Sequence, residues 1–283
     1  MLKQRVITAL VLLALLLPAI FYSNPLPFVL IVLAMLVAGS WEWARLNHLS
    51  NAAAIGTAIL TAVVAVTGYQ LGWVHAPHFL LWIMVGAAWV LASAALIKGG
   101  VASWARIPLS IRWIGGLVAL WTAGVAMVQA RAIGVNFLFS VLTLVWVADI
   151  FAYFFGRALG LRFTESKLAP AISPGKSWEG AWGGAFGVLV LAFAWVWLDV
   201  AVQSEVASFY TRLWASSGWM LLVAVLFMAA MSVVGDLVES LIKRSAGVKD
   251  SSQLLPGHGG VLDRIDALLP TLPLAMMLTS LVQ

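Results

Sequence analysis

The densest group of residues that could do chemistry lies between residues 235 and 266. It holds five carboxylates and four basic side chains, in a 283-residue chain of which only 10% is charged. Carboxylates such as Asp236 and Asp263 suit Mg²⁺, which takes one or two of them together with substrate phosphate oxygens. Lysine and arginine bind phosphate, and the glycines flanking His258 let backbone N–H groups turn toward an anion. The pattern favours metal-assisted phosphate chemistry over a solvated loop whose charges pair with one another.

A second polar group runs from residue 173 to 180, with the sequence Ser-Pro-Gly-Lys-Ser-Trp-Glu-Gly. It is not a P-loop, because that motif needs glycine at position 170, which is proline, and a preceding strand. Ser173, Lys176 and Ser177 can still bind phosphate just ahead of a helix N-terminus. A plain helix cap with Ser177 as the N-cap residue explains the same residues, and the sequence leaves both readings open.

Two single acids lie near the ends of apolar runs. Asp149 stands about six residues inside a predicted span, or roughly 9 Å deep, and a carboxylate there costs on the order of 2–3 kcal/mol. It should therefore face the bundle interior or a polar cavity, unless it pairs structurally with Arg157. Glu42 lies between Trp41 and Trp43, and we interpret these three residues as an aromatic belt with one interfacial acid.

The elements that must position these residues are membrane helices. Hydrophobic residues make up 63% of the chain, and its charged fraction is well below the roughly 25% of soluble domains. The fold class predicted is an all-α polytopic integral membrane protein, a single transmembrane domain over 1–283. Residues 1–135 contribute helices of low motif content, and residues 136–283 contribute the catalytic helices and loops. The nine expected spans are 5–22, 26–43, 52–73, 78–97, 113–130, 136–155, 180–198, 217–236 and 267–282.

Charge asymmetry predicts the orientation of these spans. If the N-terminus is cytoplasmic, 14 of the 16 Lys and Arg residues fall on the cytoplasmic side, and only Arg131 and Arg212 fall outside. The prediction is N-in and C-out, with the polar loops 156–179 and 236–266 both at the cytoplasmic face. The net charge of +5 is thereby explained without nucleic acid, and the lack of cysteine excludes thiolate catalysis and Cys-ligated zinc.

The chain resembles a known family at three motifs. The longest reads Ser240-x2-Lys243-Arg244-x4-Lys249-Asp250-x5-Pro256-Gly257-His258-Gly259-Gly260-x2-Asp263-Arg264-x-Asp266. It is similar to the signature of the phosphatidate cytidylyltransferase (CDP-diacylglycerol synthase) family. The segments Asp149-x2-Ala152-Tyr153-x2-Gly156-Arg157 and Ser173-Pro-x-Lys176-Ser177-x-Glu179-Gly180 are similar to further motifs of that family.

The resemblance implies that CTP and phosphatidate give CDP-diacylglycerol and pyrophosphate. It implies Mg²⁺ held by Asp236 and Asp263, K⁺ as a second candidate ion, and a homodimer. The compactness of the chain predicts a bacterial inner membrane, and the charge pattern predicts no nucleic-acid partner. The residues expected to be catalytic are Lys243, Arg244, Lys249, Asp250, His258, Arg264 and Asp266. Those expected to bind substrate are Asp149, Lys167, Ser173, Lys176, Ser177, Ser240, Gly257, Gly259 and Gly260.

Two alternatives are distinguishable by experiment. A CTP-dependent polyprenol kinase resembles this family but transfers the γ-phosphoryl group, so its products differ. An ion-coupled transporter would use Asp149 and Asp236 as carboxylates near the membrane midplane, with discontinuous helices. The clustering of acids at one face argues against the transporter.

Overall fold

The computed structural model describes residues 2–76 and 78–282, which form α-helices, one 3-10 helix (η1, Trp73–His75) and connecting loops, without strands. The side chains of Lys3 and Arg5, which the charge count used, lie outside this description. Seven of the described helices are long and apolar enough to cross a membrane. They are α2 (Leu26–Leu46), α3 (Asn51–Gln70), α4 (Phe79–Gly99), α6 (Leu109–Ile133), α7 (Val135–Leu159), α8 (Trp178–Ala201) and α10 (Gly218–Ser245).

These helices confirm a polytopic helical protein. The first and last expected spans form the shorter apolar helices α1 (Leu2–Phe21), whose apolar part is Val6–Phe21, and α12 (Leu268–Leu281). Three short helices fall between the expected spans: α5 (Val101–Arg106), α9 (Phe209–Ser216) and α11 (Leu262–Ile265).

Local sequence explains where α10 begins and ends. The Ser217 hydroxyl accepts a hydrogen bond from the Met220 N–H at 3.0 Å, which satisfies one of the unpaired donors of the first turn. At the other end Gly247 has a φ of +75° and its N–H donates to the Arg244 carbonyl. A positive φ just after the last turn is the usual glycine-dependent helix stop, so the polar residues that follow form a separate loop.

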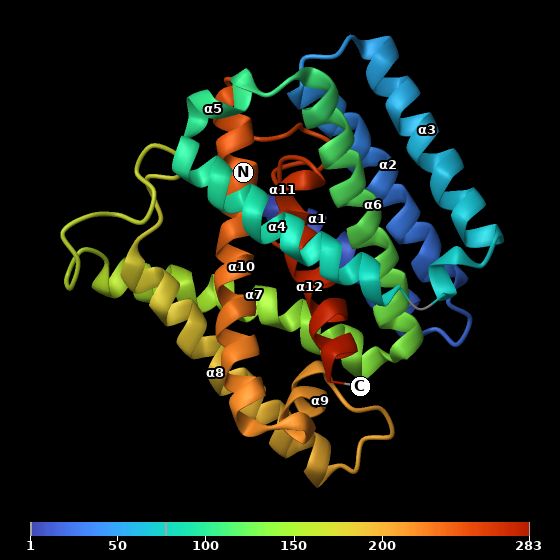
Figure 1. Ribbon diagram of the computed structural model, residues 1–283, viewed down its shortest axis with the longest axis vertical. Helices are drawn as coiled ribbons and strands as arrows, with labels where there is room; N and C mark the ends of the chain where they lie inside the picture. The colour runs from blue at the N-terminus through green and yellow to red at the C-terminus, as the bar shows by residue number, and fades with distance from the viewer. Residues whose placement is uncertain (1, 77, 283) are drawn as a thin grey trace.

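The helices pack in two groups joined by a central pair (Figure 1). In one group α7 lies along α8, and a Cβ at Gly184 of α8 would come within 2.8 Å of the Ala148 carbonyl oxygen of α7, so only glycine permits this approach. In the other group α2 packs on α3 and α6. The central helices α10 and α12 pack against each other, α10 also packs against α7 and α8, and α12 packs against α6 and α7, so the central pair connects the two groups.

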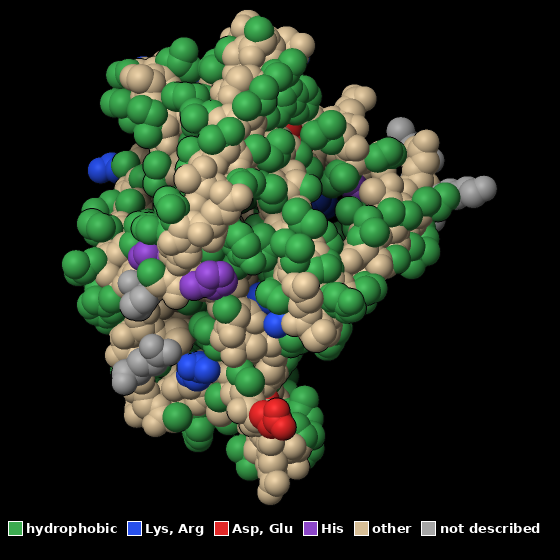
Figure 2. Space-filling model, turned by 90° about the vertical axis from the view of Figure 1, so that its right-hand side faces the viewer, with side chains coloured by type: hydrophobic (Ala, Val, Ile, Leu, Met, Phe, Trp, Pro, Cys, Tyr) green, Lys and Arg blue, Asp and Glu red, His purple; other side chains and the backbone are tan. Residues whose placement is uncertain are grey.

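The outer surface is apolar. Large hydrophobic side chains such as Leu80, Leu91 and Trp197 are about 70% exposed or more. Figure 2 shows one face on which hydrophobic side chains predominate and charged ones are few. A surface of this kind is expected to contact lipid.

A polar network fixes α9 at the end of the molecule opposite α5 and α11 (Figure 1). Asp199 of α8 is buried and accepts hydrogen bonds from four groups: Asn136 Nδ2 (2.8 Å), Thr211 Oγ1 (2.6 Å), Ser204 Oγ (3.0 Å) and the Ser208 N–H (3.0 Å). The carboxylate therefore joins α7, α8 and the start of α9.

Candidate active site

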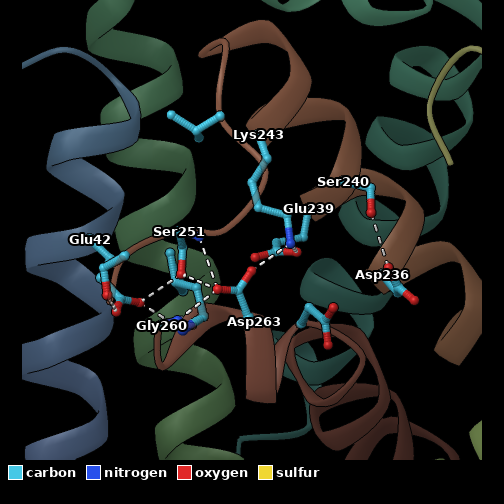
Figure 3. A network of polar contacts seen from close by, with 12 residues as sticks. Glu42, Asp236, Glu239, Ser240, Lys243, Ser251, Gly260 and Asp263 are labelled. Carbon is cyan, nitrogen blue, oxygen red and sulfur yellow. Dashed lines mark hydrogen bonds and ion pairs between the residues drawn. The ribbon is translucent and has the colours of Figure 1, made fainter. Parts of the chain in front are cut away.

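The candidate site lies at the C-terminal end of α10, which the charge count predicts to be cytoplasmic. Helical spacing places Asp236, Glu239, Ser240 and Lys243 on neighbouring turns, as the sequence predicted. Lys243 is buried and forms ion pairs with Glu239, one turn earlier on α10, and with Asp263 of α11 at 2.5 Å from its Nζ to Oδ1. Figure 3 shows Lys243 reaching between these two carboxylates. The lysine thus ties the long helix to the second half of the signature segment.

Asp263 is also held by the loop that precedes it. Its Oδ2 accepts hydrogen bonds from the Ser251 N–H (2.9 Å), the Ser251 hydroxyl (2.9 Å) and the Gly260 N–H (2.7 Å). Burial alone would raise the pKa of Asp263, but the hydrogen bond from Lys243 and the two backbone N–H groups lower it below its usual value. The carboxylate is therefore ionised at neutral pH. Gly259, with a φ of +83°, provides the backbone turn that aims the following N–H at it.

Glu42 of α2 anchors the same loop from the other side. Its side chain is fully buried and accepts hydrogen bonds from the N–H groups of Val261 (2.9 Å) and Leu262 (2.7 Å). The Ser251 hydroxyl also donates to it at 3.2 Å (Figure 3), and the Ser252 hydroxyl donates at 2.5 Å. The prediction of an interfacial acid was wrong, because both carboxylate oxygens of Glu42 point into the protein and accept hydrogen bonds from the loop.

Sequence reasoning missed Glu42, Ser251 and Ser252 as parts of the site. The only local signal was an acid between Trp41 and Trp43, which an aromatic belt explains equally well. Trp43 is itself buried, and its indole N–H donates to the Trp113 carbonyl at 3.0 Å. The burial of Trp43 argues against an aromatic belt, but burial is not visible in one sequence.

Asp236 brings the second motif to the site. Its Oδ2 lies 2.7 Å from Lys176 Nζ, and its Oδ1 accepts a hydrogen bond from the Ser240 hydroxyl at 3.1 Å. Lys176 also donates to the Val233 carbonyl of α10 at 3.3 Å. This contact joins the loop between α7 and α8 to the signature helix.

The other residues of that loop make local contacts. The Ser177 hydroxyl accepts from the Gly180 N–H at 3.1 Å and caps α8, as the cap reading expected. Lys167 Nζ donates to the Pro174 carbonyl at 2.5 Å, and the backbone N–H of Ser173 donates to the Ala169 carbonyl. Glu179, also buried, accepts from the Thr164 N–H and hydroxyl, which fixes the start of the loop.

Two further acids lie within electrostatic range of Asp236. Asp149 of α7 interacts with the charges of Asp236, Lys176 and Arg264, so α7 faces the same site. Arg157 donates to the Tyr153 hydroxyl at 3.0 Å, so the described contacts give it a partner other than Asp149. Burial, and then the charge of Asp236, raise the pKa of Asp266 to about 7.

The remaining predicted residues line the outer side of the site. Arg244, Lys249, Asp250 and Arg264 are exposed, and Arg244 donates to the Val248 carbonyl at 3.1 Å. His258 is partly buried, with a buried Nδ1 that has no hydrogen-bond partner among the described residues. Gly257 has a φ of +76°, and Gly260 is buried between Ser251 and Glu42. Exposed cations thus surround a buried, ion-paired centre.

The carboxylates fit a bound Mg²⁺ unequally. Asp236 accepts one ion pair and one hydrogen bond, which leaves lone pairs for a cation. Asp263 already has four donors on its two oxygens, so a metal could bind it only after Lys243 moved away. Within residues 2–76 and 78–282, no group of three or more His, Asp or Glu side chains is placed to hold a metal. Asp236, with 35% of its side chain exposed against 4% for Asp263, is the more accessible of the two predicted ligands.

Comparison with known proteins gives consistent matches over almost the whole chain. The sequence model of the family described as "Cytidylyltransferase family" matches residues 3–282. A protein of Pseudomonas aeruginosa named phosphatidate cytidylyltransferase is 38% identical over 96% of this chain and 95% of its own. One of Haemophilus influenzae with the same name is 36% identical, over 96% of each chain. One of Brucella abortus is 48% identical over 47% of this chain and 41% of its own.

Proposed function

Because the chain belongs to the cytidylyltransferase family, we infer that it is a nucleotidyltransferase of phospholipid biosynthesis. It transfers the cytidylyl group of CTP to phosphatidate, giving CDP-diacylglycerol and pyrophosphate. In this reaction a phosphate oxygen of the lipid forms a bond to the α-phosphorus of CTP, and the bond from that phosphorus to the β-phosphate bridging oxygen breaks. The lipid phosphate is already an anionic nucleophile, so the chain need supply no general base.

The observation that best supports a site for this chemistry is the convergence of the signature on Asp263. Lys243 from α10, Ser251 from the loop and Gly260 from the glycine turn all donate to that one carboxylate. We propose that this buried centre holds the loop in shape while substrates bind above it.

We propose that the exposed cations orient the phosphates. Arg244, Lys249 and Arg264 are exposed around the centre, so they can reach the triphosphate of CTP from the aqueous side. Lys176 is paired with Asp236, and its ammonium group can exchange this carboxylate for a phosphate oxygen of the substrate. His258, turned by Gly257 and Gly259, lies in the same loop. Positioning of this kind accounts for most of the rate gain expected in phosphoryl transfer.

Mg²⁺ dependence is part of the proposal, with K⁺ as a second candidate ion. Loop 236–266 carries a net charge of −1 beside the +2 of loop 156–179, and CTP adds several negative charges. Bound Mg²⁺ would supply charge neutralisation to the triphosphate. Asp236 has lone pairs to offer it, whereas Asp263 must first lose Lys243.

The direct test uses purified protein in detergent with Mg²⁺, phosphatidate and CTP labelled at the α-phosphorus. We expect label in the organic phase with the wild-type chain and none with Asp263→Ala. Transfer of a γ-label with no α-label would make the protein a lipid kinase. Normal turnover by Asp263→Ala in a folded preparation would contradict the role given to this carboxylate.

We also propose nine spans with the N-terminus inside and the C-terminus outside, in the inner membrane of a bacterium, and a homodimer. The chain has no cysteine, so single introduced cysteines report on one position each. Lys249→Cys should react with a membrane-impermeant maleimide only from the cytoplasmic side, and Arg212→Cys only from outside. Cross-linking in native membranes tests the dimer.

A further inference from the structure

A large apolar cavity adjoins the candidate site. It has a volume of about 490 Å³ and is bounded by one face each of α4, α6 and α10, within the roughly 300–1,000 Å³ typical of ligand pockets. Its width comes from small side chains, since α4 and α6 present four alanines and one glycine to it where larger residues would close it. These are Ala88, Ala92, Ala95, Gly115 and Ala119, whereas the Trp43 ring packs against Gly116.

The cavity is open along α4 and reaches the candidate site at its inner end. Ala88 and Ala92 line it and are exposed, which places an opening along α4 at the surface expected to meet lipid. At the inner wall it is lined by Gly235 and Glu239 of α10. Glu239 is the ion-pair partner of Lys243, so the cavity ends one side chain from the buried centre.

Two residues that line this cavity each hold a buried nitrogen donor without a hydrogen-bond partner among the described residues. The indole Nε1 of Trp104, a side chain only 6% exposed, is buried and unpaired, and so is Nε of Arg112. The Arg112 guanidinium lies 5.7 Å from the Trp104 ring, and the ion pairs of the described residues give it no carboxylate. A positive charge and an unpaired donor beside an apolar cavity call for a ligand with anionic or carbonyl oxygens on a hydrocarbon chain.

We propose that this cavity binds the lipid substrate, with an acyl chain along the alanine face of α4 and headgroup oxygens on Arg112 and Trp104. The proposal rests on the proposed function and deepens it, since it assigns a site and a side of entry to phosphatidate. The lipid enters laterally past α4, and its phosphate then lies between Arg112 and the Glu239–Lys243 pair. CTP approaches from the aqueous side, so the two substrates do not share a path.

Filling the cavity gives the first test. Each methylene group buried in the cavity strengthens lipid binding about fourfold. The indole of Ala92→Trp should displace two or more methylenes of the acyl chain, so KM for dioleoyl phosphatidate should rise at least tenfold. The KM for dihexanoyl phosphatidate, whose short acyl chains barely enter the cavity, should change less than about twofold. Ala94→Trp is the matched control, because residue 94 is exposed about 200° around α4 from Ala92 and does not line the cavity. Arg112→Gln should raise KM for both lipids and leave KM for CTP unchanged.

A binding assay without turnover gives the second test. In the cysteine-free chain, dioleoyl phosphatidate should slow the reaction of Ala92→Cys with a lipid-soluble maleimide and leave Ala94→Cys unaffected. Equal protection of both, or none, overturns the proposal, as does Ala92→Trp acting equally on long and short lipids. If the wild-type chain converted neither phosphatidate, the proposed function would fail, and the protection assay would still decide whether the cavity binds the lipid.

Discussion

Two buried carboxylates hold loops at opposite ends of the molecule, and they differ in what those loops carry. Glu42 and Asp199 each accept four hydrogen bonds from backbone N–H and side-chain donors. The partners of Asp199 are all within 63 residues of it, whereas those of Glu42 are 209 to 220 residues away. The loop held by Asp199 leads into α9, and the loop held by Glu42 carries the donors to Asp263.

The comparison teaches that the same chemistry can serve stability at one end and positioning at the other. Ser251 donates to both Glu42 and Asp263, so a shift of Glu42 reaches the centre through one side chain. Asp199 has no such link among the described contacts to the signature segment. Variants at the two positions should therefore separate loss of fold from loss of activity.

The largest expected effect is that of Glu42→Ala. It leaves two buried backbone N–H groups and the Ser252 hydroxyl without an acceptor, at about 1–3 kcal/mol for each group that finds no water, while the Ser251 hydroxyl keeps Asp263. We expect the free energy of unfolding to fall by about 3 kcal/mol or more, and cytidylyl transfer per folded molecule to fall at least about 100-fold. SDS titration and the α-label assay measure the two quantities.

Asp199→Ala should destabilise the protein as much as Glu42→Ala does and should leave the activity almost unchanged. It removes the acceptor of Asn136, Ser204, Ser208 and Thr211, so the free energy of unfolding should again fall by about 3 kcal/mol. Turnover per folded molecule should stay within about twofold of wild type. A loss of turnover as large as that of Glu42→Ala, in molecules shown to be folded, would remove the distinction between the two ends.

Ser251→Ala and Ser252→Ala sharpen the comparison within the loop. Both hydroxyls donate to Glu42, but only that of Ser251 also donates to Asp263. Each variant should lower the free energy of unfolding by about 1 kcal/mol. We expect roughly tenfold lower kcat for Ser251→Ala and little change for Ser252→Ala. Equal kcat values for the two variants would mean that the link through Ser251 carries no positioning.

The smallest effect concerns the ion pair between Lys176 and Asp236. Its side chains are 23% and 35% exposed, so solvent screens the attraction. A double-mutant cycle with Lys176→Met and Asp236→Asn should give a coupling energy in stability of about 0.5–1 kcal/mol. A coupling of several kcal/mol would show that this contact is held as rigidly as the loop on Glu42.

Most of the helical architecture could be predicted from the sequence, because spans are set by long apolar runs. The expected spans 26–43, 113–130 and 136–155 lie within α2, α6 and α7. The short helix α5 was not predicted, because six residues leave too little periodic signal. The grouping of Asp236, Ser240 and Lys243 followed from helical spacing alone.

The part of the site that could not be predicted depends on contacts distant in sequence. Nothing near Glu42 indicates that its acceptors will be needed by residues 251–262. The saturation of Asp263 by Lys243 and three loop donors was equally hidden, because a carboxylate in a signature reads the same whether it binds a metal or a lysine. The cavity beside α4 arises from alanines and glycines, which carry no chemical signal of their own.

The long sequence separation between Glu42 and its partners also delays the formation of their hydrogen bonds during synthesis. The Leu262 N–H that it accepts is made 220 residues later, which at about 5–20 residues per second takes roughly 11 to 44 s. Throughout that interval Glu42 has a carboxylate whose Leu262 partner does not yet exist. A nascent chain that stalls before residue 251 therefore carries on α2 an acid that lacks all four of its hydrogen-bond donors.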